Sequence, residues 1–142
     1  ADAPDGTGFI AIASTSQAFA ARPADGSIRA WGKSSRGGSG APGGSGFVSI
    51  ASNRFAFAAL SADGTVSAWG ESNNGGQLES TVIGRTGFIS IVPSEKAFAA
   101  LHADGSVSSW GASSFGGSGA PGASAGTSGF ASIAATDRAF AR

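Results

Sequence analysis

The sequence predicts an all-β repeat protein, and three features of the chain support this fold class. A stretch of fifteen residues occurs three times, at 18–32, 56–70 and 97–111, and a fourth copy begins at residue 139. Each complete copy holds an Asp-Gly pair between two short apolar segments, which is typical of a β-hairpin because glycine accepts the positive φ of a tight turn. No window carries apolar residues at helical spacing without an interrupting glycine, so α-helices are not expected.

Each predicted hairpin has two short arms. The first arms read Ala-Phe-Ala-Ala, and the second arms end in Trp just before a glycine. Phenylalanine, tryptophan and β-branched residues fit the packed surface of a pleated sheet. The predicted pairs of arms are 18–21 with 28–31, 56–59 with 66–69, and 97–100 with 107–110.

A further strand is expected before each hairpin. These segments begin with Gly-Phe and span residues 8–13, 46–51, 87–92 and 129–134. Apolar or small residues occupy both alternating sets of positions, so we expect these strands to be covered on both faces.

The units recur with a period near forty residues, since the numbers of Phe9, Phe47, Phe88 and Phe130 differ by 38, 41 and 42. This period, with three short strands per unit, predicts a β-propeller-type array of short antiparallel blades. We therefore treat the chain as one repeat array that is incomplete at both ends. Its predicted limits are 1–142 for the array, 8–45, 46–86 and 87–128 for the repeats, and 129–142 for a partial fourth repeat.

The connectors after the hairpins are rich in glycine. The first and third share the pattern Ser-Ser-x-Gly-Gly-Ser-Gly-Ala-Pro, at 34–42 and 113–121. The second, at 73–83, is the only one with branched residues, and a short extra strand is predicted there. Variable connectors on a repetitive scaffold are the expected place for specificity.

Composition excludes several classes of protein. Of 142 residues only 13% are charged, with nine basic and nine acidic side chains, which argues against a nucleic-acid-binding face. There is no cysteine for disulfide or thiolate chemistry, and no run of about twenty apolar residues for a membrane span. The chain also lacks methionine, so we expect a processed or excised product. Its Gly, Ala and Ser content with sparse charge favours an extracellular or cell-surface location.

The residues that could carry chemistry have simpler explanations. The repeated Asp25, Asp63 and Asp104 are residues that tight turns require, and His102 is the only histidine. One histidine without a nearby carboxylate or cysteine signal supports neither a catalytic triad nor a zinc site. The Gly-rich tracts lack the Gly-Lys-Ser/Thr and following helix of a phosphate loop. We therefore expect no catalytic, metal or cofactor residues, and no enzyme.

Trp31, Trp69 and Trp110 recur at one position of the repeat. They are expected to pack between neighbouring blades, where each would bury roughly 150–250 Å². If they were exposed they would instead be candidate platforms for stacking sugars.

These motifs resemble the repeats of the regulator-of-chromosome-condensation family of β-propellers. The match is carried by Asp63-Gly64, Val66, Trp69-Gly70, Asn73 and 76–78, which reads Gly-Gln-Leu. The short units are similar to a compact variant of the family, of which β-lactamase inhibitor protein II is a member. The family's role in nucleotide exchange on a small GTPase requires an inserted wedge and basic tails, and this sequence contains neither.

The resemblance and the partial repeats together favour a non-catalytic structural or protein-interaction module. Three repeats and a half cannot close a ring of about seven blades, within the usual range of about four to eight. The chain would join copies of itself through incomplete terminal blades, belong to a longer array, or stay open. The alternative is a lectin-like or inhibitor-like module that binds a ligand with its variable loops. The candidate interaction residues are Arg36, Asn73, Asn74, His102, Phe115 and Phe140.

Overall fold

The computed structural model describes residues 4, 7–80, 82–118, 134–135 and 140–141. Three antiparallel sheets of three strands form most of it, and each sheet keeps the order of the chain. We call these sheets blades 1, 2 and 3. Their strands are β1 (Phe9–Ser14), β2 (Ala18–Pro23) and β3 (Arg29–Gly32); β4 (Phe47–Ser52), β5 (Ala56–Ser61) and β6 (Val66–Gly70); and β7 (Phe88–Pro93), β8 (Ala97–His102) and β9 (Val107–Gly111).

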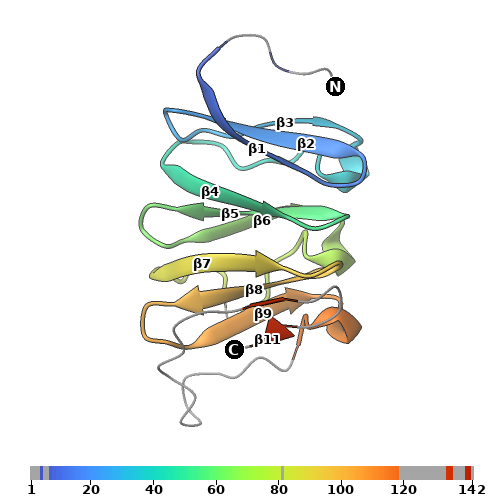
Figure 1. Ribbon diagram of the computed structural model, residues 1–142, viewed down its shortest axis with the longest axis vertical. Coiled ribbons are helices and arrows are strands. Elements are labelled where there is room, and N and C mark those ends of the chain that lie inside the picture. Colours follow the sequence, from blue (N-terminus) through green and yellow to red (C-terminus); the bar gives the residue numbers. More distant parts are fainter. Residues whose placement is uncertain (1–3, 5–6, 81, 119–133, 136–139, 142) are drawn as a thin grey trace.

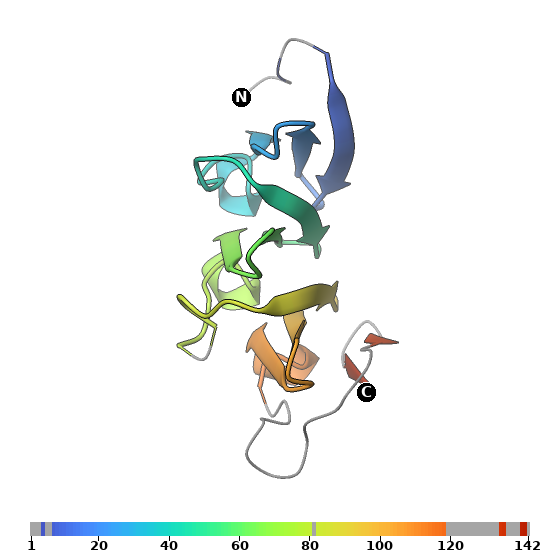
Figure 2. The ribbon, with the colours of Figure 1, turned by 90° about the vertical axis from the view of Figure 1, so that its left-hand side faces the viewer.

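A fourth, two-stranded sheet pairs β10 (Ala134–Ala135) with β11 (Phe140–Ala141). The blades follow one another along the long axis of the molecule, with blade 1 at one end (Figure 1). The side view shows the same succession of separate sheets (Figure 2). The predicted all-β array of three-stranded antiparallel blades is therefore confirmed.

The Asp-Gly turns form between the second and third strands, as the sequence predicts. In each turn the aspartate Oδ1 accepts the backbone N–H of the residue two positions later, at 2.9, 3.0 and 2.8 Å. The following glycines have φ of 79°, 83° and 85°, a region that side-chain-bearing residues seldom adopt. The register of the hairpin is thus set by local turn chemistry.

Each connector begins with a short 3-10 helix, which the sequence did not indicate. The three helices are η1 (Ser34–Arg36), η2 (Ser72–Asn74) and η3 (Ser113–Phe115). They lie at the end of the blades opposite the Asp-Gly turns (Figure 1). A side chain from the turn between the first two strands of the same blade fixes each helix by donating to the carbonyl of its last residue. These bonds join Thr15 to Arg36 at 2.9 Å, Asn53 to Asn74 at 2.7 Å, and Ser94 to Phe115 at 2.6 Å.

The extra strand predicted in the second connector is wrong for the residues described there. After η2 this connector runs through bends and turns without joining a sheet. Its Val82 is fully buried between blades 2 and 3, and Leu78 packs against the same cluster. Burial of these side chains between blades, not strand pairing, accounts for the branched residues.

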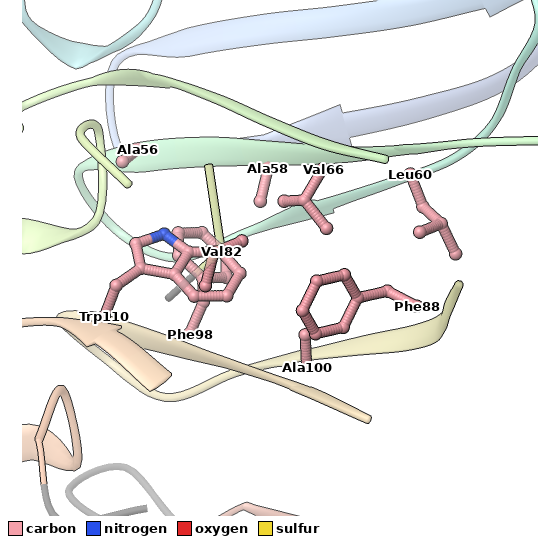
Figure 3. Close-up of a cluster of buried hydrophobic side chains, with 9 residues drawn as sticks. All are labelled: Ala56, Ala58, Leu60, Val66, Val82, Phe88, Phe98, Ala100 and Trp110. Atoms are coloured by element: carbon pink, nitrogen blue, oxygen red, sulfur yellow. The ribbon is translucent and has the colours of Figure 1, made fainter. Parts of the chain in front are cut away.

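The core lies between consecutive blades, and the two interfaces that join blades 1, 2 and 3 are built in the same order. Between blades 2 and 3, blade 2 contributes small or aliphatic side chains, and blade 3 contributes two phenylalanines, an alanine and a tryptophan (Figure 3). Blades 1 and 2 meet in the same way. Blades 2 and 3 therefore each turn an aromatic face toward the preceding blade, and blades 1 and 2 each turn an alanine-rich face toward the following blade.

The prediction that the first strand of each unit is covered on both faces is wrong for β1, β4 and β7. Ile10, Val48 and Ile89, at equivalent positions of these strands, are all exposed. The reason is that only some positions of each first strand face a neighbouring blade: in β4, Phe47 and Ile50 pack into the cluster between blades 1 and 2, whereas Val48 belongs to neither cluster.

Candidate interaction surfaces

The interfaces between blades 1 and 2 and between blades 2 and 3 show which contacts bury the aromatic face of a blade. Trp69 stacks on Phe57 with ring centroids 5.2 Å apart and donates its indole N–H to the carbonyl of Gly37, at 3.1 Å. Trp110 stacks on Phe98 in the same way and donates to the Gly75 carbonyl, also at 3.1 Å. A complete interface therefore joins stacked rings to a glycine carbonyl in the preceding connector.

The glycine in this contact is dictated by space as well as by conformation. Gly37 has φ of 98°, and a Cβ built on it would lie 2.5 Å from the Phe57 ring. Gly75 stands in the same relation to Phe98, at 2.6 Å. The first glycine of the Gly-Gly pair in the first and second connectors is therefore part of an interface between blades, although the sequence there indicates only a glycine-rich connector.

Blade 1 carries the same aromatic face without a cover in the part of the chain that the structure describes. We call this surface the open aromatic face, and it consists of Phe9, Ile12, Phe19 and Trp31. Phe19 stacks on Trp31 at 5.6 Å, but Phe19 is 46% exposed and Ile12 67% exposed. The equivalent Phe57 and Phe98 are 0% exposed. A hollow of about 450 Å³ lies on this face, lined by Pro4, Phe9, Ile10, Ala11, Ile12, Ala21 and Trp31.

A second surface gathers cations around aromatic rings on the rim that carries the 3-10 helices. The Phe55 ring receives Arg36 at 4.7 Å, Lys96 at 5.5 Å and Arg54 at 5.7 Å from its centroid. Lys96 also lies 5.0 Å from the centroid of Phe115. Because these residues come from three separate units, the cluster exists only through the stacking of the blades.

Carboxylates alternate with these cations. Arg36 pairs with Glu71 at 3.0 Å, and Arg54 pairs with Glu95 at 2.7 Å, each across a boundary between blades. The pKa of Glu71 is lowered, first by the hydrogen bond from Asn74 and then by Arg36. The rim is therefore a mixed-charge surface.

The structure brings four of the six predicted interaction residues to this rim and separates the fifth from them. Arg36, Asn73, Asn74 and Phe115 all belong to 3-10 helices. His102 lies at the opposite end of the blades, before the third Asp-Gly turn. Phe140 belongs to β11, and its side chain lies outside the described part of the structure.

Sequence reasoning missed Phe55, Arg54 and Lys96. They occupy the two positions before each fifteen-residue stretch, where the first unit has Ser16 and Gln17. Comparison of the repeats at those positions would have shown how their chemistry changes.

His102 has a structural role in this arrangement. Its Nε2 lies 2.7 Å from the carbonyl of Thr86, and its Nδ1 accepts the backbone N–H of Asp104 at 3.2 Å. The pKa of Asp104 is lowered to about 2, first by the hydrogen bond from the Ser106 hydroxyl and then by the Ser106 N–H. Hydrogen bonds from the Ser27 hydroxyl and N–H likewise lower the pKa of Asp25. The pKa of Asp63 is lowered first by the hydrogen bond from the Ser61 hydroxyl and then by those from Thr65. Each of these carboxylates therefore accepts hydrogen bonds within its own Asp-Gly turn.

The residues that the structure describes contain neither a metal-binding cluster nor a membrane-spanning helix. No group of three or more His, Asp and Glu side chains there could hold a metal ion. None of the helices in that part is long and apolar enough to cross a membrane.

Comparison with known proteins gives matches in structure alone. No family profile matches the sequence, and no curated protein is significantly similar to it. Human WBSCR16 superimposes with a TM-score of 0.56 at 20% identity over 77% of this chain. Prp20p of Saccharomyces cerevisiae does so with a TM-score of 0.54 at 18% identity over 72% of the chain.

The blades have the fold of regulator-of-chromosome-condensation propellers. Both neighbours belong to that family, and this chain spans 34% of the first and 30% of the second. The Prp20p structure was described with that protein's binding to Gsp1p and histones. At this level of identity the similarity to regulator-of-chromosome-condensation repeats is one of fold.

Proposed function

We propose that the chain is a non-catalytic protein-interaction module of compact regulator-of-chromosome-condensation type, which assembles through its terminal blades. Its partner would be another copy of the chain or the remainder of a longer array. The observation that carries this proposal is the open aromatic face, because the equivalent faces of blades 2 and 3 are buried against a preceding blade. Exposed apolar surfaces of this kind mark interaction sites.

Two further observations support the proposal. The similar propeller Prp20p has protein partners, Gsp1p and histones. The blades have three strands each, in keeping with a compact variant such as β-lactamase inhibitor protein II. Within this proposal the module is extracellular or at the cell surface, as its Gly, Ala and Ser content with sparse charge favours. The repeat limits at 8–45, 46–86 and 87–128 stay a prediction.

Sedimentation velocity tests the proposal directly. We expect the population of species larger than the 13.7 kDa chain to grow as the protein concentration rises through the micromolar range. A chain that stays monomeric throughout that range would count against self-assembly.

The second candidate function is ligand binding at the 3-10 rim, and the cluster of cations around Phe55 and Phe115 favours it. A glycan array would compare the wild-type chain with Arg36→Ala and Phe115→Ala. Binding that both rim variants lose, and that Trp31→Ala keeps, is the expected result for a rim site. A wild-type chain that binds no glycan would contradict the lectin form of this function.

A further inference from the structure

The second connector forms a polar hollow against the end of blade 3. The hollow has a volume of about 310 Å³, and the residues that line it are Ser72, Asn73, Gln77, Leu78, Glu79 and Gly111. The first five follow β6, and the last one ends β9. The hollow therefore lies where blades 2 and 3 meet, inside the array and away from the open aromatic face.

The fold leaves the hydrogen-bonding groups of this lining free. Four of the lining residues have polar side chains that form no hydrogen bond and no ion pair among the residues that the structure describes: Ser72, Asn73, Gln77 and Glu79. The neighbouring Asn74 differs, because it donates its side-chain amide to Glu71 and accepts the Asn53 amide at its backbone carbonyl. The polar groups of the hollow are therefore available to a ligand.

The backbone that carries these free side chains is fixed at both ends of the segment. Gly76 donates its N–H to the Glu71 carbonyl at 2.9 Å. Val82 donates its N–H to the Glu79 carbonyl at 2.9 Å, and its side chain is fully buried between the blades. Between these two points Leu78 packs against the same buried cluster. A site that is held in place before binding loses less conformational entropy when the ligand arrives.

The first connector has no counterpart of this polar set. At the positions equivalent to 72, 73, 77, 78 and 79 its residues are Ser34, Ser35, Ser39, Gly40 and Ala41. The second connector thus carries two amides, an aliphatic side chain and a carboxylate where the first has only small residues. Both connectors keep the Gly-Gly pair, so the change is one of side chains on a similar backbone. Variation of this kind is where a repetitive scaffold places binding specificity.

The chemistry of the hollow matches a small, neutral, polyhydroxylated ligand. A primary amide offers both donors and an acceptor, and a carboxylate offers acceptors only. Neighbouring hydroxyls of a sugar ring donate and accept, so this mixture can satisfy them. None of the described residues that line the hollow is a cation, and Glu79 would repel an anion. Ligand pockets span roughly 300–1,000 Å³, so a hollow at the small end of that range suits one ring.

We propose that this hollow binds a single sugar residue, with Asn73 and Gln77 exchanging hydrogen bonds with its neighbouring hydroxyls and Glu79 accepting from them. Leu78 supplies the apolar contact beside these polar groups. The site uses none of the cations around Phe55, and it does not depend on self-assembly of the chain.

Titration of the isotope-labelled full chain with monosaccharides, followed by NMR, tests this site. The probes are the methyl glycosides of glucose, mannose and galactose, with glucuronate as the anionic probe. We expect at least one neutral sugar to shift the side-chain amide signals of Asn73 and Gln77 at millimolar concentration. Glucuronate should bind at least about fivefold more weakly than the glucoside, because of its repulsion by Glu79. Shifts confined to other residues would contradict the inference.

Three variants and a matched control test the named side chains. Asn73→Ala, Gln77→Ser and Glu79→Gln each remove part of the hydrogen-bonding set, and each should weaken sugar binding about tenfold. Glu79→Gln keeps the shape of the side chain, so it should also narrow the difference between glucoside and glucuronate. The control is Ser39→Ala, which changes the position equivalent to Gln77 in the first connector and should keep wild-type affinity. Circular dichroism confirms that each variant is folded.

The outcomes separate this inference from the proposed functions. If no neutral sugar binds, this inference is overturned, and self-assembly through the terminal blades is unaffected. If sugar binding persists in the three variants of the hollow and is lost in Phe115→Ala, the ligand lies at the cation cluster, and this site is wrong. If Ser39→Ala weakens binding as much as Gln77→Ser does, the effect does not arise in the hollow. A peptide that shifts the same signals when no sugar does would also overturn the inference.

Discussion

Trp110 and Trp31 occupy the same position of the repeat, yet they lie in different surroundings. The Trp110 ring is fully buried and its N–H meets the Gly75 carbonyl, whereas Trp31 is partly exposed. A phenylalanine at position 110 would keep the stacking on Phe98 and leave a buried carbonyl without its donor. The indole N–H should therefore affect stability only where a preceding blade is present.

We expect Trp110→Phe to lower the free energy of unfolding by about 1–3 kcal/mol, the cost of an unsatisfied buried polar group. Trp31→Phe is the matched control, and it should change the free energy of unfolding of the monomer by less than about 0.5 kcal/mol. Urea denaturation at low protein concentration measures both. Equal losses in the two variants would contradict the importance of the glycine carbonyl.

The turn aspartates predict a dependence of stability on acid pH. The pKa of Asp104 is lowered from 3.8 to about 2 in the folded chain, because the Ser106 hydroxyl and N–H donate to its carboxylate. Between the pKa of 3.8 in the unfolded chain and the pKa of about 2 in the folded chain, Asp104 therefore binds more protons in the unfolded chain than in the folded chain. The stabilisation that ionised Asp104 provides is complete when the pH lies above 3.8, and it is lost as the pH falls through about 2. Asp25 and Asp63, whose pKa values are also lowered, act in the same direction.

We expect the melting temperature of the wild-type chain to fall as the pH is lowered from about 4 to about 2. Asp104→Asn cannot titrate, so this variant should show a smaller fall over the same interval. Thermal melts followed by circular dichroism at each pH compare the two proteins. Parallel curves for wild type and variant would show that Asp104 makes no contribution to acid sensitivity.

At the scale of the element, the second connector stabilises the stack by burying one side chain. Val82 is fully buried between blades 2 and 3, while its neighbour Ile83 is exposed. We expect Val82→Ala to lower the free energy of unfolding by about 2 kcal/mol, through lost burial and the cavity that remains. Ile83→Ala should change it by less than about 0.5 kcal/mol. Urea denaturation distinguishes them, and equal effects would show that Val82 does not fill the space between the blades.

At the scale of the whole molecule, blade 1 has a neighbour on one side only in the described structure. In a stack of repeats, stability arises largely from the interfaces between neighbours. We expect amide hydrogens of β2 to exchange with solvent faster than those of β5 and β8 at low protein concentration. Hydrogen exchange followed by mass spectrometry measures this, and equal protection of the three strands would contradict it.

The same experiment at high concentration connects stability to assembly. If a second copy covers the open aromatic face, β2 should gain protection as the concentration rises, because binding to the folded state stabilises it. Ile12→Ser should show no such gain. Protection of β2 that does not change with concentration, in a chain that associates, would point to a different contact surface.

Much of the fold could be predicted because its turns and strands depend on residues close together in the sequence, and because the same pattern recurs in each unit. The Asp-Gly turns form from residues within a few positions of one another, and the hairpin strands follow from the short apolar segments on either side of them. The packing of Trp69 and Trp110 between blades follows from large rings at a constant position of the repeat. The 3-10 helices were missed because their Ser-rich sequences carry no helical periodicity.

The candidate surfaces could be predicted only in part. Of the loop residues expected to act together, Arg36, Asn73, Asn74 and Phe115 share a rim, whereas His102 lies at the opposite end of the blades. Phe55 and Lys96 complete that cluster, but they lie far apart in the sequence from Arg36 and meet it only because three units stack in register.

The sequence by itself determined the unit: three short strands, a turn fixed by Asp and Gly, and aromatic residues at constant positions. Only the tertiary structure decided which copy of each aromatic residue is covered. Phe19 and Phe57 occupy the same position of nearly identical segments, yet one is 46% exposed and the other is buried. The physical reason is that burial depends on what lies across the interface. A preceding blade supplies the connector and glycine carbonyl for Phe57 and Trp69, and in the described structure nothing equivalent lies over blade 1.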